Sequence, residues 1–181
     1  MMTIFIIGYM ASGKTTFGRA LARQTGLQHI DLDFYIEQRF HSTVRDIFAN
    51  KGEDEFRRIE GEMLREVGEM EDTIISCGGG TPCFGDNIDY MNSRGLTVCL
   101  QASDDTIADR IIQAGDKRPL MAGKSRDEII RTLREHMEQR RPYYDRAQLL
   151  ISGDRLENRR QIAETVADFI KNHLNNLEER E

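Results

Sequence analysis

A phosphate-binding loop motif near the amino terminus constrains this chain more than any other feature. A short apolar run at residues 4–7 leads into Gly8, and Gly13-Lys14-Thr15 follows after four intervening residues. Glycines at the two ends of such a loop adopt backbone angles that let successive amides wrap around an anion. The lysine reaches the terminal phosphates of a nucleotide, the threonine hydroxyl is a ligand for Mg²⁺, and the helix that begins here points its positive end at the same phosphates. The motif therefore predicts a site for a nucleoside triphosphate and magnesium.

The surroundings of the motif support that interpretation. The loop follows an expected strand and precedes an expected amphipathic helix at about residues 14–24, whose apolar side carries Phe17, Ala20 and Leu21. This strand–loop–helix order is the setting in which the motif binds phosphate. A glycine-rich turn without a ligand is the weaker interpretation.

Composition sets the size and the partners that we expect. The 181 residues are 39% hydrophobic and 31% charged, which suits a single domain over residues 1–181 with a frayed tail at about residues 175–181. The net charge of −6 argues against a nucleic-acid partner, because a phosphate backbone requires a basic face. Small anionic substrates are still compatible with this charge if arginines are concentrated locally.

The amino-terminal residues and the cysteines indicate in which cellular compartment we expect the protein. Residues 1–3 place no basic region ahead of a long apolar stretch, so we expect neither export nor a membrane partner. The three cysteines include no Cys-x-x-Cys pair, which argues against a disulfide framework or a zinc site. Cys77 is interpreted as a small buried residue and not as a nucleophile. A reducing cytoplasm is the expected location.

Strand-like and helix-like segments alternate along the whole chain. Strands are expected at residues 4–7, 28–33, 73–77, 96–100 and 149–151, and helices at 14–24, 34–40, 43–70 with a break near 51–52, 86–92, 103–112, 127–140 and 159–174. This alternation predicts an α/β fold with a five-stranded parallel sheet flanked by helices. Pro142 is expected to end the helix at residue 140, because a proline forces the preceding residue out of helical geometry.

Two acids stand at the end of the second expected strand. Asp31 and Asp33 alternate with Leu32, so a strand that persisted to residue 33 would place both carboxylates on one side, at the edge of the sheet where ligands bind. Alternatively, Asp33 caps the helix at residues 34–40. The two roles are not exclusive, and the sequence leaves both open.

Charged and glycine-rich segments in the middle of the chain also have two interpretations. Glu53 and Arg57, and likewise Asp54 and Arg58, have the i, i+4 spacing of a self-paired, solvated helix face. The less favoured alternative turns Arg57 inward to bind a substrate carboxylate through its guanidinium fork. The three glycines at residues 78–80 indicate either a strained turn or a close approach of ligand to backbone.

A segment at about residues 113–126 lacks the pattern of a regular element. It contains Gly115, Pro119 and Gly123 together with the basic pair Lys117-Arg118. A polar, arginine-bearing insertion between helices is typical of a mobile lid over phosphates. A plain surface loop is the alternative.

Taken together, these motifs resemble the shikimate kinase family of P-loop proteins, which is similar to the nucleoside monophosphate kinases. The resemblance runs from residue 4 to about residue 170. It rests on motifs at residues 8–15, 31–33, 56–60, 78–80, 118–120 (Arg-Pro-Leu) and 140–144 (Arg-x-Pro-x-Tyr). It implies a P-loop, nucleoside-monophosphate-kinase-like fold with a mobile lid, and a monomer. The implied reaction transfers the ATP γ-phosphoryl group to the 3-hydroxyl of shikimate, giving shikimate 3-phosphate and ADP in aromatic amino-acid biosynthesis.

The resemblance also assigns roles to individual residues. Asp33 would be the base, with Lys14 and Arg118 as the other catalytic groups, and the acceptor-binding region would span about residues 33–61. The implied nucleotide contacts are Gly8, Ala11, Ser12, Gly13, Lys14, Thr15, Thr16, Arg110, Arg118 and Arg155. The implied shikimate contacts are Asp33, Phe56, Arg57, Glu60, Gly78, Gly79, Gly80 and Arg140. Thr15 and Asp31 would support Mg²⁺. The adenine contacts Arg110 and Arg155 match the family pattern least well.

Three other functions are weighed against this one. A gluconate kinase also phosphorylates a hydroxylated carboxylic acid on a similar fold, and fold alone does not settle the substrate. A nucleoside monophosphate kinase is a more distant alternative. A module that binds ATP without transferring phosphate would not need Asp33 or Arg118, and both residues are present.

Overall fold

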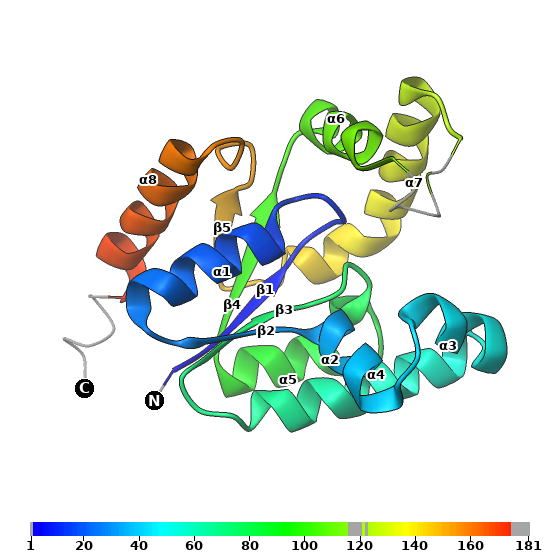
Figure 1. The fold of residues 1–181 in the computed structure, drawn as a ribbon, viewed down its shortest axis with the longest axis horizontal. Coiled ribbons are helices and arrows are strands. Elements are labelled where there is room, and N and C mark those ends of the chain that lie inside the picture. Colours follow the sequence, from blue (N-terminus) through cyan, green and yellow to red (C-terminus); the bar gives the residue numbers. More distant parts are fainter. Residues whose placement is uncertain (1, 116–120, 122, 175–181) are drawn as a thin grey trace.

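The computed structural model describes residues 2–115, 121 and 123–174, and these form one five-stranded sheet (Figure 1). The strands are β1 (Thr3–Ile7), β2 (Gln28–Asp31), β3 (Thr73–Ser76), β4 (Leu96–Gln101) and β5 (Leu149–Ser152). Their order is β2-β3-β1-β4-β5, and all four neighbouring pairs are parallel. The predicted α/β class and parallel sheet are confirmed. Because the chain moves to opposite sides of β1, the carboxyl end of β1 lies at the position where such sheets bind ligands.

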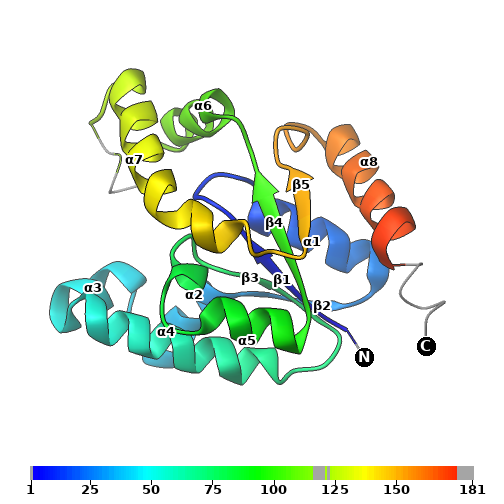
Figure 2. The same ribbon diagram turned by 180° about the vertical axis from the view of Figure 1, so that it is seen from behind.

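Helices cover both faces of the sheet. They are α1 (Lys14–Thr25), α2 (Leu32–Phe40), α3 (Val44–Lys51), α4 (Glu53–Gly68), α5 (Asn87–Arg94), α6 (Asp104–Ala114), α7 (Arg126–Tyr144) and α8 (Arg159–Phe169), with a 3₁₀ turn η1 (Thr81–Cys83) and a π-helical turn η4 (Ile170–Leu174). Figures 1 and 2 show α1 and α8 on one face, and α4 and α5 on the other.

The alternating side chains of β1 explain this layering. Ile4 and Ile6 are fully buried in the cluster that includes Phe17 of α1. Phe5 and Ile7 are fully buried in the other cluster, against α4 and α5. Successive residues of a strand point to opposite faces, and a strand that is buried on both faces must be apolar throughout. The run at residues 4–7 therefore fixes the centre of the sheet and, with it, the start of the phosphate loop.

The prediction that Pro142 ends its helix is wrong. Helix α7 continues to Tyr144 with Pro142 inside it, and the Asp145 amide still donates to the Arg141 carbonyl at 2.9 Å. Pro142 costs the helix one amide hydrogen bond, and its ring crowds the carbonyl of Glu138. Tyr144 is 1% exposed. The burial of this large side chain outweighs the local preference of the sequence.

The prediction for the two acids also needs correction. Strand β2 ends at Asp31, and helix α2 begins at Leu32, so the strand does not continue to Asp33. Asp31 is the N-cap residue: its Oδ1 accepts a hydrogen bond from the Phe34 amide at 3.3 Å. Asp33 therefore does not cap the helix but lies in its first turn.

Several other boundaries agree with the sequence. Gly26 ends α1 in the left-handed conformation at φ 77°, and the break between α3 and α4 falls at Gly52, as expected. Much of the expected lid, including Arg118, lies outside the described residues, as does the expected tail at residues 175–181. Within the described ranges, no helix combines the length and the apolar character needed to cross a membrane.

Candidate active site

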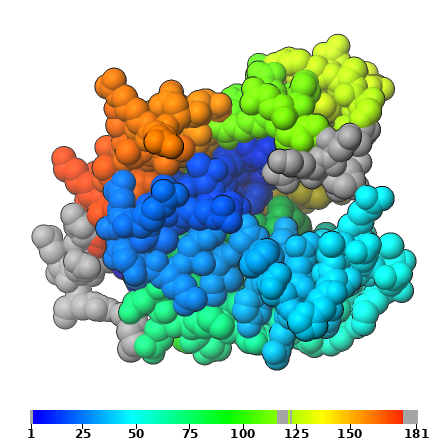
Figure 3. Space-filling model, viewed as in Figure 1, coloured from blue at the N-terminus to red at the C-terminus, as the bar shows by residue number. Residues whose placement is uncertain are grey.

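The phosphate loop connects β1 to α1 and lies in a hollow of the molecular surface. In Figure 3 its dark-blue residues are at the back of a recess between α6 and α3. Gly8 has φ 139°, and a Cβ there would lie 2.4 Å from the Leu100 carbonyl oxygen. Gly13 has φ 106°, and its Cβ would lie 2.6 Å from Leu156 Cδ1. Both positions therefore require glycine on grounds of conformation and of space.

The first turn of α1 is arranged to receive an anion. Its N-cap residue is Gly13, which has no side chain to accept hydrogen bonds from the first amides of the helix. Free amides and the helix dipole together attract negative charge. Lys14 Nζ lies 2.8 Å from both the Gly8 and the Tyr9 carbonyl oxygens, which keeps its ammonium group at the loop.

Thr15 and Asp31 meet beside this turn. The Thr15 hydroxyl donates to Asp31 Oδ2 at 2.8 Å, while Oδ1 of the same carboxylate caps α2. Both are hard oxygen ligands, which suit Mg²⁺. Among the described residues no group of three or more His, Cys, Asp or Glu side chains forms a metal cage. Mg²⁺ typically uses one or two protein oxygens and takes its other ligands from phosphates and water.

A cavity of about 590 Å³ extends from the phosphate loop to the start of α2, α3 and α4. Most of the residues to which the sequence assigns a role line it. These are Ala11, Gly13, Lys14, Thr15, Thr16, Asp31, Asp33, Phe56, Arg57, Glu60, Gly78, Gly79, Gly80, Arg110 and Arg140. The fold thus places a phosphate site and a second, mixed-charge site in one space.

Asp33 is the most perturbed carboxyl group in this cavity. Burial, together with the negative charges of Glu60 and Asp31, raises its pKa to about 6, although the Lys14 ammonium partly opposes the increase. A carboxylate with a pKa near the working pH is suited to accept a proton during a reaction and release it afterwards.

Arg57 forms the expected i, i+4 pair with Glu53 at 3.4 Å, but it faces the cavity and is not part of a solvated surface as the favoured interpretation held. Its side chain is 17% exposed, and Nη1 donates to Glu60 Oε2 at 2.8 Å. The guanidinium carbon lies 4.0 Å from the centroid of the Phe84 ring, so an aromatic face also holds the group. By contrast, Arg58 is 56% exposed and pairs with Glu55 at 2.7 Å, as a solvated helix face requires. The two adjacent arginines have different environments.

The three glycines at residues 78–80 provide room for charged side chains. None of them has a positive φ, so the strained-turn interpretation is wrong. A Cβ at Gly78 would lie 3.0 Å from Asp33 Oδ1, and a Cβ at Gly80 would lie 2.8 Å from Arg57 Nη2. At these two positions a larger residue would displace the Asp33 carboxyl group or the Arg57 guanidinium.

Arg140 approaches the same loop from α7. A Cβ at Gly79 would lie 3.3 Å from Arg140 Nη1, and the guanidinium carbon is 5.3 Å from the centroid of the Tyr9 ring. Four residues further on, the Tyr144 hydroxyl donates to the Gly79 carbonyl at 2.6 Å. The helical path through Pro142 therefore anchors α7 to the glycine loop and holds Arg140 over the cavity.

Comparison with known proteins identifies the family. A family model described as shikimate kinase matches residues 10–171. A shikimate kinase of Phocaeicola vulgatus is 47% identical over 97% of this chain and 99% of its own length. The chain belongs to the shikimate kinase family. It is therefore an ATP-dependent kinase that acts on shikimate.

Solved structures agree with this assignment to the shikimate kinases. The crystal structure of shikimate kinase from Bacteroides thetaiotaomicron superposes with a TM-score of 0.91 at 44% identity, over 94% of this chain and 97% of that one. A shikimate kinase from Acinetobacter baumannii, solved in complex with shikimate, has a TM-score of 0.83 at 26% identity, over 97% of this chain and 94% of that one.

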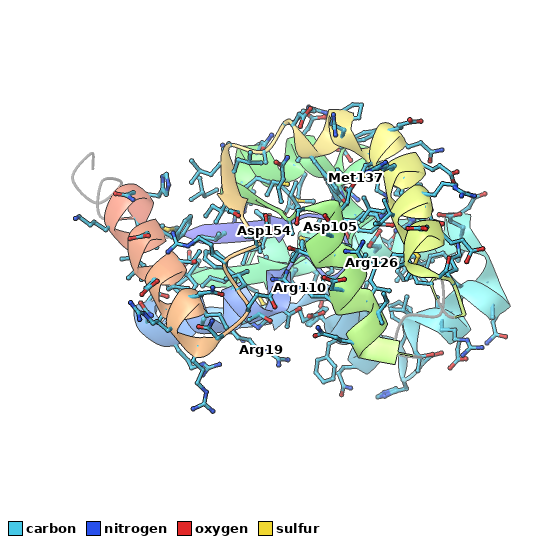
Figure 4. All side chains as sticks on the ribbon, turned by 90° about the horizontal axis from the view of Figure 1, so that it is seen from above. Arg19, Asp105, Arg110, Arg126, Met137 and Asp154 are labelled. Carbon is cyan, nitrogen blue, oxygen red and sulfur yellow. The ribbon has the colours of Figure 1, made fainter. Side chains whose placement is uncertain are left out.

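The two arginines that the shikimate kinase resemblance assigns to adenine lie in different places. Arg110, labelled in Figure 4, donates to the Ala11 carbonyl at 3.0 Å and to the Gly153 carbonyl at 2.8 Å, so it joins the phosphate loop to the loop after β5. Arg155 instead faces α8, 3.4 Å from Glu164, and lines a separate cavity. The structure does not bring Arg155 to the site, and its assigned contact stays a prediction.

Gly8 and Ser12 lie behind the cavity wall. Gly8 contributes its carbonyl to Lys14, and Ser12 is fully buried with no hydrogen-bond partner for its Oγ among the described residues. Both residues shape the loop from within.

Sequence reasoning missed the apolar part of the wall in this shikimate kinase. Met10, Val44, Phe48 and Leu156 also line the cavity. The Phe48 and Phe56 ring centroids lie 4.2 Å apart, so Phe48 supports the wall beside Arg57. The only local signal was the i, i+4 spacing of Val44 and Phe48, which is equally typical of a core helix.

Proposed function

We propose that this cavity transfers the γ-phosphoryl group of ATP to the 3-hydroxyl of shikimate, with Asp33 as the general base. The observation that carries the proposal is the position of Asp33, a carboxyl group with a pKa of about 6, in the cavity that also contains Lys14 and Arg57. This combination supplies a base, a phosphate-binding cation and a carboxylate-binding cation within one space.

Binding of the acceptor is assigned to two guanidinium groups and the acid. Arg57 and Arg140 approach the glycine loop from α4 and α7, which supports a grip on the shikimate carboxylate from two sides. Glu60 holds Arg57 in place, and Phe56 forms the adjacent wall. Asp33 then faces the hydroxyl groups of the ring. Fixing the carboxylate in this way would orient one hydroxyl toward the phosphate loop.

The chemical step needs positioning and charge neutralisation more than covalent chemistry from the protein. The hydroxyl oxygen forms a bond to the γ-phosphorus, the bond from phosphorus to the β–γ bridging oxygen breaks, and Asp33 accepts the hydroxyl proton. Lys14 neutralises charge on the phosphoryl oxygens. Arg118 is assigned the same role, although it lies outside the described residues. Thr15 and Asp31 would hold Mg²⁺, which supplies further positive charge to the phosphates when bound.

The organisation of the chain is also part of the proposal. We assign residues 1–181 to one kinase domain, with an acceptor-binding region at about residues 33–61 and a mobile lid at about residues 113–126. The enzyme is proposed to act as a monomer in the cytoplasm, without a nucleic-acid or membrane partner. All three cysteines are free, which suits a reducing compartment. Light scattering after size-exclusion chromatography would overturn the monomer if it gave twice the chain mass.

The proposed reaction is tested by ADP release from purified protein with magnesium and ATP. Parallel samples contain shikimate, quinate, gluconate or no acceptor. Release that depends on shikimate, with phosphorus NMR placing the product phosphate on the 3-hydroxyl, is the expected result. If only gluconate stimulated ADP release, the acceptor site would be that of a gluconate kinase. If ATP bound tightly but no acceptor stimulated ADP release, the protein would be a module that binds ATP without transferring phosphate.

A further inference from the structure

A second cavity, of about 760 Å³, lies between α1 and the start of α8. We call it the α1–α8 groove. It is lined by Thr15, Thr16, Arg19, Ala20, Arg23, Gln24, Arg159, Ile162 and Ala163. Its wall contains three arginines and no carboxylate. Thr15 and Thr16 line both this groove and the active-site cavity, so the two spaces meet at the phosphate loop.

The three arginines are not neutralised by the protein. Arg19, Arg23 and Arg159 are exposed, and none of them forms an ion pair with a described residue. Two carboxylates of the adjoining segments are already paired with other arginines: Glu157 with Arg110, and Glu164 with Arg155 and Arg160. The groove therefore presents uncompensated positive charge.

Local stability explains only one of the three positions: Arg23 lies in the last turn of α1, where the helix dipole favours a cation. Arg19 and Arg23 have i, i+4 spacing on α1, where like charges repel. Arg159 is the first residue of α8, where the helix dipole disfavours a cation, and no acidic residue occurs in that first turn. Arg19, labelled in Figure 4, and Arg23 line the groove from α1, and Arg159 lines it from α8, so like charges face it from both helices.

The net charge of the whole chain indicates what these arginines can do. With a net charge of −6, the protein as a whole repels a nucleotide that carries a negatively charged polyphosphate. A local concentration of positive charge beside the phosphate loop can reverse this repulsion where binding occurs. Arg19 and Arg23 follow Thr15 by one and two helical turns, about 6 and 12 Å along the helix axis. Attraction over such distances is strong at low ionic strength, and is screened once the Debye length falls to about 3 Å near 1 M salt.

We propose that the α1–α8 groove is an electrostatic capture site for the polyphosphate of the incoming nucleotide. Its arginines raise the association rate constant by drawing the anion toward Thr15 and Thr16, and they do not hold the nucleotide once it is bound. The inference rests on the proposed function only in requiring that the phosphate loop bind a nucleotide. Steering of this kind changes association rate constants by about 10- to 1,000-fold, and three charges at the edge of a site belong at the lower end.

The test is stopped-flow binding of 2-aminopurine riboside triphosphate with Mg²⁺, because the fluorescent group of this nucleotide is the base and leaves the phosphates unmodified. The variant combines Arg19→Gln, Arg23→Gln and Arg159→Gln. At about 20 mM salt its association rate constant should be about tenfold below that of the wild type. At about 500 mM salt the two constants should agree within about twofold, and the dissociation rate constants should be similar at both concentrations.

A control with the same change in net charge combines Arg94→Gln, Arg146→Gln and Lys171→Gln. The first two positions precede β4 and β5, at the end of the sheet opposite the phosphate loop, and the third lies in η4, beyond the carboxyl end of α8. The control should bind at close to the wild-type rate. Equal slowing of both variants would overturn the capture site in favour of a general charge effect.

Faster dissociation of the groove variant at high salt would also overturn it, because the arginines would then be contacts of the bound nucleotide. Binding is measured without an acceptor, so the result does not depend on phosphoryl transfer. If the wild type failed to bind the nucleotide at all, the proposed function and not the capture site would be at fault.

Discussion

The phosphate loop and the acceptor pocket differ in how the chain builds them. The loop is one continuous stretch, residues 8–15, whose conformation is set by Gly8, Gly13 and the start of α1. The acceptor pocket brings together Asp33 of α2, residues 56–60 of α4, the glycines before η1, and Arg140 of α7. A local motif can define a nucleotide site by itself. A pocket for a particular acceptor depends on the packing of several helices around the sheet.

The largest expected effect on turnover comes from a substitution in the phosphate loop. Lys14→Met should lower turnover by about 1,000-fold with every acceptor, because the loop serves all of them equally. ADP release measured with shikimate, and in its absence as background hydrolysis, gives the comparison. Circular dichroism checks that the variant is folded. Turnover within tenfold of the wild type would contradict the assignment of Lys14 and the argument from the loop.

The next effect should be confined to the acceptor side. Asp33→Asn should lower turnover by at least about 100-fold, which is the contribution of a well-placed general base. Nucleotide affinity, measured by titration with 2-aminopurine riboside triphosphate, should change little, since Asp33 lies on the acceptor side of the cavity. Near-normal turnover would remove Asp33 from the mechanism, and a loss of nucleotide binding would mean that the two regions are not separable in this way.

Arg57 and Arg58 are a matched pair within one helix. Arg57→Ala should raise the KM for shikimate about 30-fold, equivalent to about 2 kcal/mol for a charged hydrogen bond, with a smaller effect on kcat. Arg58→Ala should leave the KM within about twofold, because exposed ion pairs contribute little. Equal effects at both positions would return Arg57 to the solvated-face interpretation.

The sequence identified these two regions to different extents. The residue types and the spacing of the phosphate loop predicted its structure, because contiguous residues determine its shape. For Arg57, spacing alone favoured the wrong interpretation, and only the resemblance to the shikimate kinases assigned it to the pocket. What turns it inward is Phe84, almost thirty residues away, and the buried Glu60. The i, i+3 spacing of Arg57 and Glu60 is local, but no local pattern shows that Glu60 is buried or that Phe84 lies against Arg57.

The errors in secondary structure have the same physical origin. Asp31 and Asp33 are both good caps, and the choice between them depends on where β2 stops pairing with β3. Pro142 is a strong local signal to end a helix, yet Tyr144 is buried and bonded to the Gly79 carbonyl. Tertiary contacts decided both cases. The apolar wall formed by Met10, Val44 and Phe48 was missed because these residues look like ordinary core.

The pH dependence of the rate should distinguish the base from the rest of the pocket. Because the pKa of Asp33 is raised to about 6, the unprotonated base is lost as the pH falls through that value. The kcat/KM for shikimate, which reports the groups of the free enzyme, should then fall about tenfold for each pH unit below about 6. The residual activity of Asp33→Asn should lack this dependence. A wild-type kcat/KM that is flat down to pH 5 would contradict the assignment of the base.

The smallest expected effect concerns the stability of the pocket. A raised pKa means that the folded state disfavours the ionised Asp33 carboxylate, and that this cost develops as the pH rises from about 4 to about 6. Asp33→Asn removes the charge, so at pH 7 it should raise the free energy of unfolding by about 1 kcal/mol, less than the full cost because the amide must also be desolvated. Urea unfolding at pH 7 and at pH 4 measures the difference, which should disappear at pH 4.

Asp154 provides a control with the opposite sign. Burial would raise the pKa of this carboxyl group, but hydrogen bonds from Thr106 and Ser103 outweigh it and lower the pKa below its usual value. Ser103 donates to Asp154 Oδ1 at 2.9 Å from its amide and at 3.0 Å from its hydroxyl. Asp154→Asn should therefore destabilise the protein at pH 7. If Asp33→Asn also destabilised the protein at pH 7, the folded state would not disfavour the ionised Asp33 carboxylate, and the raised pKa would be contradicted.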